Sequence, residues 1–324
     1  MTRFVLIGTG WRAMFYVRVA AFLPSSFSIQ SVYTRSPFQK SHMDELGLNA
    51  FTSLDMALSV EHDAVIVSSG EEGFYEMLME LDRRGETILA ETSFLGLEDE
   101  MLKDLESVKG YVLEQWQFTP RFQSILSSLD LIGPCDQVMI SYLHNHHAAS
   151  IARRVLNIKD EVPSLVKADH VYTCARTASR KGRDESGQLE ECTRKIRILD
   201  FGKKGIFIND FTTNQYHNFL YDSHIEIRGE RGTLTEKGVT YLDKDSRPIR
   251  NELVFHRDID ASNASLSLSH VSLGDRVVFT NPYYGLNMND DEIAIARMLN
   301  DFSDGKLEYT IMEGIRDARI GKLL

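Results

Sequence analysis

A glycine-rich turn near the start of the chain carries residue types that can hold a dinucleotide phosphate. It fits the pattern G-x-G-x-x-A, lies between an apolar strand pattern and a helical pattern, and comprises Gly8, Thr9, Gly10, Trp11, Arg12 and Ala13. Gly8 permits a tight turn, Gly10 lets a pyrophosphate approach the backbone, and Ala13 allows close helix–strand packing. The free N–H groups at the helix start attract the anion. We therefore expect the turn to bind a nucleotide, with a purely structural glycine turn as the alternative.

The end of the second predicted strand indicates whether the ribose of the bound cofactor carries a 2′-hydroxyl or a 2′-phosphate. Residues 33–36 read Tyr-Thr-Arg-Ser, at a place where a carboxylate would bind a ribose 2′-hydroxyl. Arg35 would pair instead with a 2′-phosphate, and we expect no acid nearby to repel that phosphate. The sequence therefore predicts NADP, with NAD, or a merely solvated Arg35, as the alternative. Thr34, Ser68 and Ser69 are further predicted cofactor contacts.

Three histidines, His144, His146 and His147, lie at the start of a predicted helix. Hydride transfer from an alcohol needs a base for the hydroxyl proton, and an imidazole that titrates near neutrality suits that task. His147 is the predicted catalytic base, and His144 shares its face if the helix begins early. Structural or capping roles and a metal site are the alternatives. No metal is predicted, because three imidazoles in four residues cannot all converge on one ion.

Two carboxylates, Glu91 and Glu114, come at the predicted carboxyl ends of strands, where ligands bind in open α/β sheets. Either could orient the nicotinamide ribose, the carboxamide or the substrate. Either could equally cap a neighbouring helix. Trp11 is expected to shield the phosphate turn or to pack against a second domain.

The elements that must position these residues alternate between strand and helix up to about residue 117. This alternation is typical of βαβ units and a parallel sheet. The apolar runs lack polar alternation, as expected when helices cover both faces. We predict an α/β domain, a Rossmann doubly wound parallel sheet, over residues 1–117. Its predicted strands are Arg3–Ile7, Ser28–Tyr33, Ala64–Ser68, Thr87–Ala90 and Tyr111–Gln115.

The pattern changes after Pro120, and residues 118–324 are predicted to form an α+β domain. Two helical stretches come first, and strand patterns then dominate from about residue 165 to 280. Polar and apolar residues alternate there, which is typical of an open, mostly antiparallel sheet with one covered face. Asn289 and Glu292 resemble a capping box, which opens a helix that Gly305 closes.

Composition argues against several classes of protein. The 324 residues carry a net charge of −11, so a basic field for nucleic-acid binding is not expected. No apolar run approaches the roughly 18 residues of a membrane span, and the start of the chain does not read as a signal peptide. Cys135, Cys174 and Cys192 are widely spaced, which favours reduced packing thiols in a cytoplasmic protein. We therefore expect neither nucleic acid nor membrane as a partner.

Taken in order along the chain, these motifs resemble the glucose–fructose oxidoreductase/inositol dehydrogenase (Gfo/Idh/MocA) family. The resemblance spans nearly all of the chain. It implies a Rossmann domain followed by a substrate domain whose open sheet face forms a homodimer or higher homo-oligomer. Beyond the glycine turn and Val-Tyr-Thr-Arg, it is carried by Ala-Val-Ile-Val-Ser-Ser (64–69), Ile-Leu-Ala-Glu (88–91), Ile-Arg-Gly-Glu-Arg-Gly-Thr-Leu (227–234) and Asp-Glu-Ile-Ala-Ile-Ala (291–296).

The chain departs from the family at several positions that carry chemistry, so it resembles a divergent branch. Thr92 stands where the family has the lysine of its Glu-Lys-Pro triplet, and a threonine cannot supply that ammonium. His147 aligns with the family's helix-opening histidine. The family's two flanking acids and an earlier histidine are replaced here by Leu143, Ser150 and Phe74. The segment that includes Glu114, Gln115 and Gln117 aligns with another family motif, which implies that Gln115 contacts cofactor and that Gln117 contacts substrate.

The sequence thus predicts an NADP-dependent oxidoreductase that transfers hydride to or from a small hydroxyl or carbonyl compound of sugar or polyol type. His147 would relay the proton, and His144, Glu114 and Gln117 would position substrate. The alternative is a catalytically silent nucleotide-binding sensor or regulator, which the missing lysine at Thr92 supports. A third class, a purely structural oligomer, predicts no nucleotide binding at all.

Overall fold

The chain falls into two compact units in a computed structural model that describes residues 1–141, 143–179, 182–260 and 265–324. The first unit comprises Met1–Thr119, Asp260–Ser267 and Tyr283–Arg316, and the second comprises Pro120–Ile259, Leu268–Pro282 and Asp317–Leu324. No helix in the described ranges is both long enough and apolar enough to cross a membrane.

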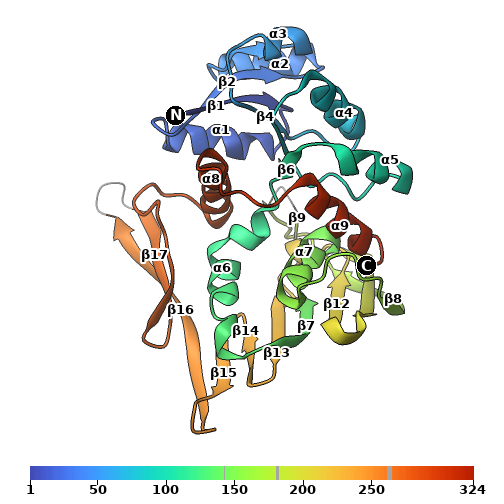
Figure 1. Cartoon of the computed structure of the whole chain (residues 1–324), viewed down its shortest axis with the longest axis vertical. Helices are drawn as coiled ribbons and strands as arrows, with labels where there is room; N and C mark the ends of the chain where they lie inside the picture. Colours follow the sequence, from blue (N-terminus) through green and yellow to red (C-terminus); the bar gives the residue numbers. More distant parts are fainter. Residues whose placement is uncertain (142, 180–181, 261–264) are drawn as a thin grey trace. The chain divides into compact units, whose positions relative to one another are not determined.

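The first unit is built on a six-stranded parallel sheet with the order β3-β2-β1-β4-β5-β6 (Figure 1). The order reverses beside β1, whose neighbours are β2 and β4, and this reversal opens a crevice at the carboxyl ends of the strands. All four residues of β4 are buried, as the continuous apolar run predicts. The strands are β1 (Thr2–Ile7), β2 (Phe27–Tyr33), β3 (Ala50–Phe51), β4 (Ala64–Val67), β5 (Ile88–Ala90) and β6 (Gly110–Val112).

Short helices alternate with these strands, as the sequence pattern predicts. They are α1 (Ala13–Phe22), α2 (Pro37–Glu45), α3 (Leu54–Leu58), α4 (Phe74–Arg84), α5 (Asp99–Asp104) and the 3₁₀ segments η1 (Leu105–Ser107) and η2 (Gln115–Phe118).

One detail of the first unit differs from the sequence prediction, and another agrees with it. The predicted strand Tyr111–Gln115 ends at Val112, so Gln115 opens η2 and is not in the sheet. The helix predicted after Asn289 forms as α8 (Asp290–Ser303), and both hydrogen bonds of its capping box are present at 2.9 Å. This helix packs beside α1 within the first unit, although its sequence position follows the strand-rich region (Figure 1).

The second unit contains most of a ten-stranded sheet with the order β18-β17-β16-β15-β14-β13-β7-β12-β11-β8. β7 and β12 pair in parallel, whereas the other pairs with a described register are antiparallel. The predicted open, mostly antiparallel sheet is therefore confirmed. Its strands are β7 (Cys135–Ser141), β8 (Ser164–Ala175), β11 (Leu189–Asp200), β12 (Ile206–Thr212), β13 (His224–Gly229), β14 (Gly232–Thr235), β15 (Gly238–Leu242), β16 (Pro248–Asp260), β17 (Ser265–Leu273) and β18 (Arg276–Thr280).

Helices cover one face of this sheet, and the remaining elements connect its strands. Val138 and Ile140 of β7 are fully buried, and α7 packs on that strand through the buried Ala148 and Ile151. The remaining elements are α6 (Pro120–Leu126), η3 (Leu129–Leu131), α7 (Asn145–Leu156), the two-stranded ribbon β9 (Ala178–Ser179) and β10 (Gly182–Arg183), η4 (Gly202–Lys204) and η5 (Gln215–His217). The helix α9 (Ile311–Gly321) begins in the first unit and ends in the second.

Candidate functional site

The glycine turn has the geometry that its sequence predicts. Gly8 has φ +109°, and a Cβ built on it would lie 2.3 Å from the carbonyl oxygen of Ser68, so only glycine fits there. A Cβ built on Gly10 would meet nothing within 4 Å, which leaves open space in front of the backbone at that residue. Ala13 is fully buried at the start of α1. The turn therefore packs tightly against β4 on one side and stays open on the other.

A cavity of about 760 Å³ lies at the carboxyl ends of β1, β2 and β4. Seven of the predicted cofactor contacts line it: Gly8, Thr9, Gly10, Thr34, Arg35, Ser68 and Ser69. The other five are not part of its lining: Trp11, Arg12, Ala13, Glu91 and Gln115. Sequence reasoning missed the contribution of the loop after β4 and the first turns of α4, which add Glu72, Gly73, Glu76, Met77 and Glu80.

Two hydroxyl groups in this cavity have no partner among the described residues. The Oγ atoms of Ser68 and Ser69 are both buried, and neither makes a hydrogen bond there. Buried polar atoms are almost always hydrogen-bonded in proteins. Two unpartnered hydroxyls beside an open glycine turn therefore fit a polar ligand such as a nucleotide.

Arg35 lies at the rim of the cavity with its guanidinium exposed, and its Nη2 donates to the backbone carbonyl of Glu72 at 3.4 Å. The expectation that no acid lies near Arg35 is wrong, because Glu72, Glu76 and Glu80 line the same cavity. Glu80 is neutralised by Arg83 and Arg84 at 2.7 and 2.6 Å. Glu72 and Glu76 form no ion pair within the described ranges, so their carboxylates are not neutralised by a neighbouring cation there. Sequence proximity could not show this, since α4 is far from Arg35 along the chain.

A buried ion pair fastens the glycine turn to the end of β5. Arg12 Nε donates to Glu91 Oε1 at 2.9 Å, and the Tyr16 hydroxyl, which is fully buried, donates to the same oxygen. The side chains of Arg12 and Glu91 are only 16% and 8% exposed. Glu91 thus holds the first turn of α1, a role that the sequence did not predict.

The charges in this cluster depend on one another. Burial is the largest effect on Arg12 and would lower its pKa, but the charge and hydrogen bond of Glu91, together with Tyr16 and Asp291, raise it. Burial, and then the charge of Glu91, raise the pKa of Tyr16 well above its usual value. Burial likewise raises the pKa of Asp291, at the start of α8, although Arg12 opposes this shift. Arg12 is therefore a fixed cation held mainly by Glu91.

Trp11 is 68% exposed and packs edge-on against Phe15, with ring centroids 4.8 Å apart. The guanidinium groups of Arg12 and Arg18 lie 5.3 and 4.4 Å from the centroid of the same Phe15 ring. Trp11 therefore has packing support from α1 while most of its surface stays in solvent.

Glu114, Gln115 and Gln117 lie at and within η2 of the first unit. The Glu114 side chain is fully buried and accepts a hydrogen bond from the Trp116 backbone N–H at 3.1 Å, so it caps η2. Glu114 therefore acts as a helix cap, which is the alternative to a ligand-binding role. Gln115 and Gln117 are both buried, and Gln115 Oε1 has no partner among the described residues.

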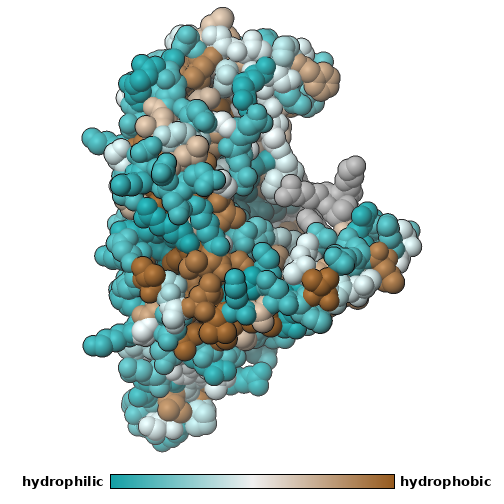
Figure 2. Space-filling model, turned by 90° about the vertical axis from the view of Figure 1, so that its right-hand side faces the viewer, coloured by the Kyte–Doolittle hydropathy of each residue, from teal (hydrophilic) through white to brown (hydrophobic). Residues whose placement is uncertain are grey.

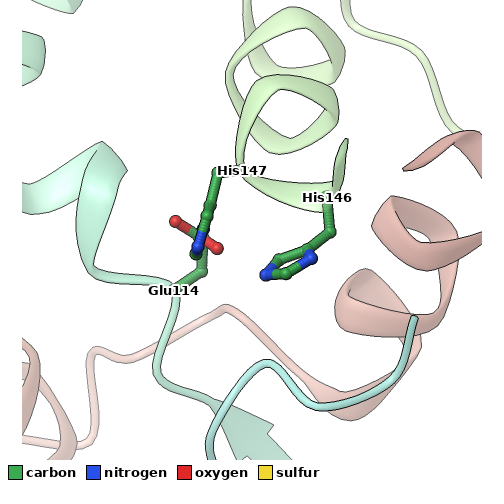
Figure 3. Close-up of side chains that lie close together, drawn as sticks. All are labelled: Glu114, His146 and His147. Atoms are coloured by element: carbon green, nitrogen blue, oxygen red, sulfur yellow. The ribbon is translucent and has the colours of Figure 1, made fainter. Parts of the chain in front are cut away.

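The histidines gather at the start of α7 in the second unit. His144 occupies the N-cap position, and the helix begins at Asn145, which has φ +46°, a conformation that asparagine tolerates better than most residues. The rings of His146 and His147 lie 4.1 Å apart between centroids on the first turn (Figure 3). The rings of His144 and His147 are 5.8 Å apart, although the helix begins at Asn145 and not early enough to include His144.

Leu143 and Ser150, at the positions where the resembled family carries acids, have structural roles in this segment. Leu143 is fully buried, and its carbonyl accepts a hydrogen bond from Asn209 Nδ2 at 3.0 Å. Ser150 Oγ donates to the carbonyl of His147 at 2.9 Å. These residues anchor the backbone on either side of the histidines, and neither supplies a charge.

The last residues of the chain support the same helix start. Arg153 of α7 pairs with Asp317 at 2.6 Å, and both side chains are 4% exposed. A Cβ built on Gly321 would lie 2.7 Å from the backbone nitrogen of His146, so glycine allows a close approach there. The position of the histidines in the second unit thus depends on residues far from them in sequence.

A second cavity, of about 740 Å³, opens beside His144 within the second unit. The His144 ring packs edge-on against Phe211 and Tyr216, with centroids 5.2 and 5.1 Å apart. The His144 backbone N–H donates to the Tyr216 hydroxyl at 3.2 Å. Lys195 and Arg176 add positive charge to the lining, and Glu190 adds negative charge. Aromatic rings beside polar and charged groups suit a small polar ligand.

Comparisons with known proteins identify the fold. No family model matches the chain, and no curated protein matches it. Solved structures match over nearly the whole chain. An oxidoreductase from Agrobacterium radiobacter, in complex with NAD+, L-tartaric acid and magnesium, is 12% identical with a TM-score of 0.67, covering 99% of this chain and 94% of that one.

Two further structures agree with this likeness. A putative myo-inositol dehydrogenase from Sinorhizobium meliloti is 14% identical with a TM-score of 0.64, covering 99% of this chain and 95% of that one. Biliverdin reductase from Synechocystis, in complex with biliverdin and NADP+, is 12% identical with a TM-score of 0.62, covering 99% and 97%. The chain therefore has the Rossmann-plus-open-sheet fold of these oxidoreductases, as the family resemblance implies.

Proposed function

We propose that the protein is an NADP-dependent oxidoreductase, with NAD as the alternative cofactor, acting on a small hydroxyl or carbonyl compound of sugar or polyol type. The observation that carries the proposal is the cavity at the switch in strand order, where Gly10 faces open space and two buried serine hydroxyls lack partners. Solved structures of the same fold bind NAD+ or NADP+, and one is described as a putative inositol dehydrogenase.

In this proposal the dinucleotide lies along the glycine turn. Backbone N–H groups at the start of α1 bind its diphosphate, and Ser68 and Ser69 donate to its polar groups. A nicotinamide ring, when bound, supplies the acceptor or donor of the hydride. Arg12 donates to Glu91, which also accepts from Tyr16, so the turn is fixed before the ligand arrives and little ordering is needed on binding.

We assign the transfer of the substrate's hydroxyl proton to His147. An imidazole changes its protonation state near neutral pH, so it can take the proton of a substrate hydroxyl or return it to a carbonyl. Ser150 bonds to the carbonyl of His147 and helps to fix the first turn of α7. The roles of His144, Glu114 and Gln117 in positioning substrate remain part of the proposal.

The choice of NADP rests on Arg35, and the unpaired Glu72 and Glu76 in the same cavity oppose it. The variant Arg35→Asp tests the choice, because it should weaken NADPH binding far more than NADH binding. The variant Glu72→Gln is its counterpart and should strengthen NADPH binding. Equal NADPH affinities in all three proteins would refute a 2′-phosphate site at Arg35.

Turnover tests the function itself. The full chain is incubated with reduced nucleotide and a broad panel of sugar-derived and other small carbonyl compounds, and nicotinamide absorbance is followed. We expect one class of carbonyl to be reduced, and His147→Ala to abolish turnover with nucleotide affinity unchanged. His42→Ala, on the exposed side of α2, is the matched control and should behave as wild type. Normal turnover in His147→Ala would reject the assigned proton role.

A silent sensor or regulator is the second candidate. Thr92 cannot provide the family's ammonium, and Glu91 beside it is engaged by Arg12 and Tyr16. This candidate predicts tight nucleotide binding without turnover across the whole carbonyl panel. The two candidates therefore differ in turnover and agree in binding.

We also propose that the exposed sheet face of the second unit forms a homo-oligomer. Val166, Ile198, Ile208 and Met139 lie opposite one another on adjacent strands, so their side chains share one face, and Val166 is 64% exposed. Figure 2, which views the side of Figure 1 where β8 and β12 lie, shows apolar side chains gathered in a largely hydrophilic surface. Sedimentation of wild type and Val166→Lys tests this, because the variant should dissociate. A wild-type monomer would contradict the proposal.

A further inference from the structure

Two cysteines that are 18 residues apart in sequence meet on the sheet of the second unit. Cys174 is on β8 and Cys192 is on β11, and the antiparallel register pairs Cys192 with Tyr172 and Cys174 with Glu190. The two cysteines are therefore diagonal neighbours on adjacent strands. Their Sγ atoms lie 2.9 Å apart. An S–S bond is about 2.0 Å long, so a small movement of the two side chains would suffice to form one.

The two thiols differ in their access to solvent. Cys192 is fully buried, whereas Cys174 is partly exposed on β8, the last strand in the order of the sheet. Burial, and then the neighbouring thiol of Cys174, raise the pKa of Cys192 to about 12. A small oxidant in solution therefore reaches Cys174, while Cys192 stays a protected thiol behind it.

Polar groups hold the Cys174 sulfur in place. Asn218 Nδ2 donates to Cys174 Sγ at 3.7 Å and to the carbonyl of Ala175 at 3.1 Å. The hydroxyls of Tyr221 and Tyr172 lie 2.5 Å apart. The contacts of Asn218 therefore fix the sulfur beside Cys192, which favours reaction between the two over reaction with a thiol elsewhere.

We propose that Cys174 and Cys192 form an oxidation site that converts to an intrachain disulfide when a peroxide reacts with the folded protein. In the first step the Cys174 sulfur attacks hydrogen peroxide, its S–H becomes S–OH, and one water leaves. In the second step the Cys192 sulfur attacks the sulfenic sulfur and the S–S bond forms as the S–O bond breaks. The hydroxide leaves with the Cys192 proton as a second water. The peroxide is the two-electron oxidant, and no other reactant is consumed.

Peptide mapping of the oxidised full chain tests the proposal. The reduced protein is treated with hydrogen peroxide, unfolded in acid, alkylated with N-ethylmaleimide and digested with trypsin without reductant. We expect alkylatable thiols to fall from the three of the sequence to one, which is Cys135. The peptide 168–176, with Cys174, should be recovered linked to the peptide 184–194, with Cys192.

Three variants provide the controls. Cys135→Ser should form the same cross-link as wild type. Cys192→Ser should leave Cys174 as a sulfenic acid that dimedone traps. Cys174→Ser should leave the buried Cys192 unmodified at the same peroxide dose.

The wild-type map is decisive even if a variant does not fold. Recovery of Cys174 as a sulfinic acid with Cys192 still free would overturn the proposal. A link only between separate chains, or two unreacted thiols at a dose that oxidises a free cysteine in solution, would also overturn it.

Discussion

The substitution Glu91→Gln tests whether one carboxylate fixes the glycine turn. Glutamine keeps the size of the side chain and an oxygen that can accept from Arg12 Nε and from the Tyr16 hydroxyl. It removes the negative charge. Arg12 would then be a largely buried guanidinium without its principal counter-ion, because Glu91 makes the largest favourable contribution to its charge. We therefore expect the substitution to destabilise the first unit.

The expected loss of unfolding free energy follows from the burial of the Arg12–Glu91 ion pair. Removing one partner of a buried ion pair typically costs about 3–5 kcal/mol. Arg12 is still 16% exposed, and Asp291 also contributes favourable charge, so the low end applies, about 3 kcal/mol. In a domain of this size each kcal/mol lowers Tm by about 2–4 °C, which predicts a fall of about 6–12 °C.

Tryptophan fluorescence reports on the first unit alone. The chain has two tryptophans, Trp11 and Trp116, and both lie in that unit. Urea titrations of wild type and Glu91→Gln, followed by this signal, give the difference in unfolding free energy directly. Glu45→Gln is the matched control, because this carboxylate on α2 is 78% exposed and lies 3.9 Å from His42, so no measurable change is expected.

The double variant Arg12→Met/Glu91→Gln completes the test. Replacing both members of a buried pair by neutral groups of similar size is often close to neutral, so most of the lost stability should return. If Glu91→Gln unfolds at the wild-type urea concentration, or if the double variant is no better than the single one, the idea of a charge-dependent anchor is wrong.

Three other predictions follow from the second unit and from the end of the first. The methyl group of Gly321→Ala would lie 2.7 Å from the backbone nitrogen of His146. The substitution should lower the free energy of unfolding by about 1–3 kcal/mol and should lower turnover, with nucleotide affinity unchanged. Wild-type turnover and stability would contradict this. Burial raises the pKa of Tyr283 from 10 to about 12. Between pH 10 and pH 12 the Tyr283 hydroxyl therefore keeps its proton in the folded state and loses it in the unfolded state. The free energy of unfolding should fall by about 2–3 kcal/mol across that range. Urea titrations across that range should show a shallower loss in Tyr283→Phe, and parallel curves would refute the assignment. Oxidation of Cys174 and Cys192 closes a short loop and should stabilise the wild-type chain by about 3 kcal/mol relative to peroxide-treated Cys174→Ser; equal melting temperatures would count against the disulfide.

Local sequence pattern was sufficient for much of the fold. The apolar run 64–67 and the glycine turn predict a strand and a strand-to-helix bend because both signals depend on neighbouring residues. The capping box of Asn289 and Glu292 was equally readable, since its two hydrogen bonds join residues three apart. In the candidate site, Gly8, Thr34 and Ser68 could be placed together because strand ends in a parallel sheet meet at one edge.

Contacts between distant segments could not be read in the same way. Glu91 looked like a ligand-binding carboxylate, and only the packing of α1 on the sheet shows that Arg12 and Tyr16 engage it. Cys174 and Cys192 looked like separate packing thiols, because strand register decides that they meet. Glu72 lines the same cavity as Arg35 because the loop after β4 places it there. That loop has no hydrophobic periodicity from which its path could be predicted.

Calorimetric titration of the full chain with NADPH and NADH tests the central claim most directly, because the account depends on the open backbone at Gly10. We predict saturable heat for wild type with at least one reduced nucleotide. Gly10→Val fills the open space and should weaken that binding at least about tenfold, or about 1.4 kcal/mol, with an unchanged urea midpoint. No heat and no thermal protection with either nucleotide, or equal affinity in Gly10→Val, would contradict the account.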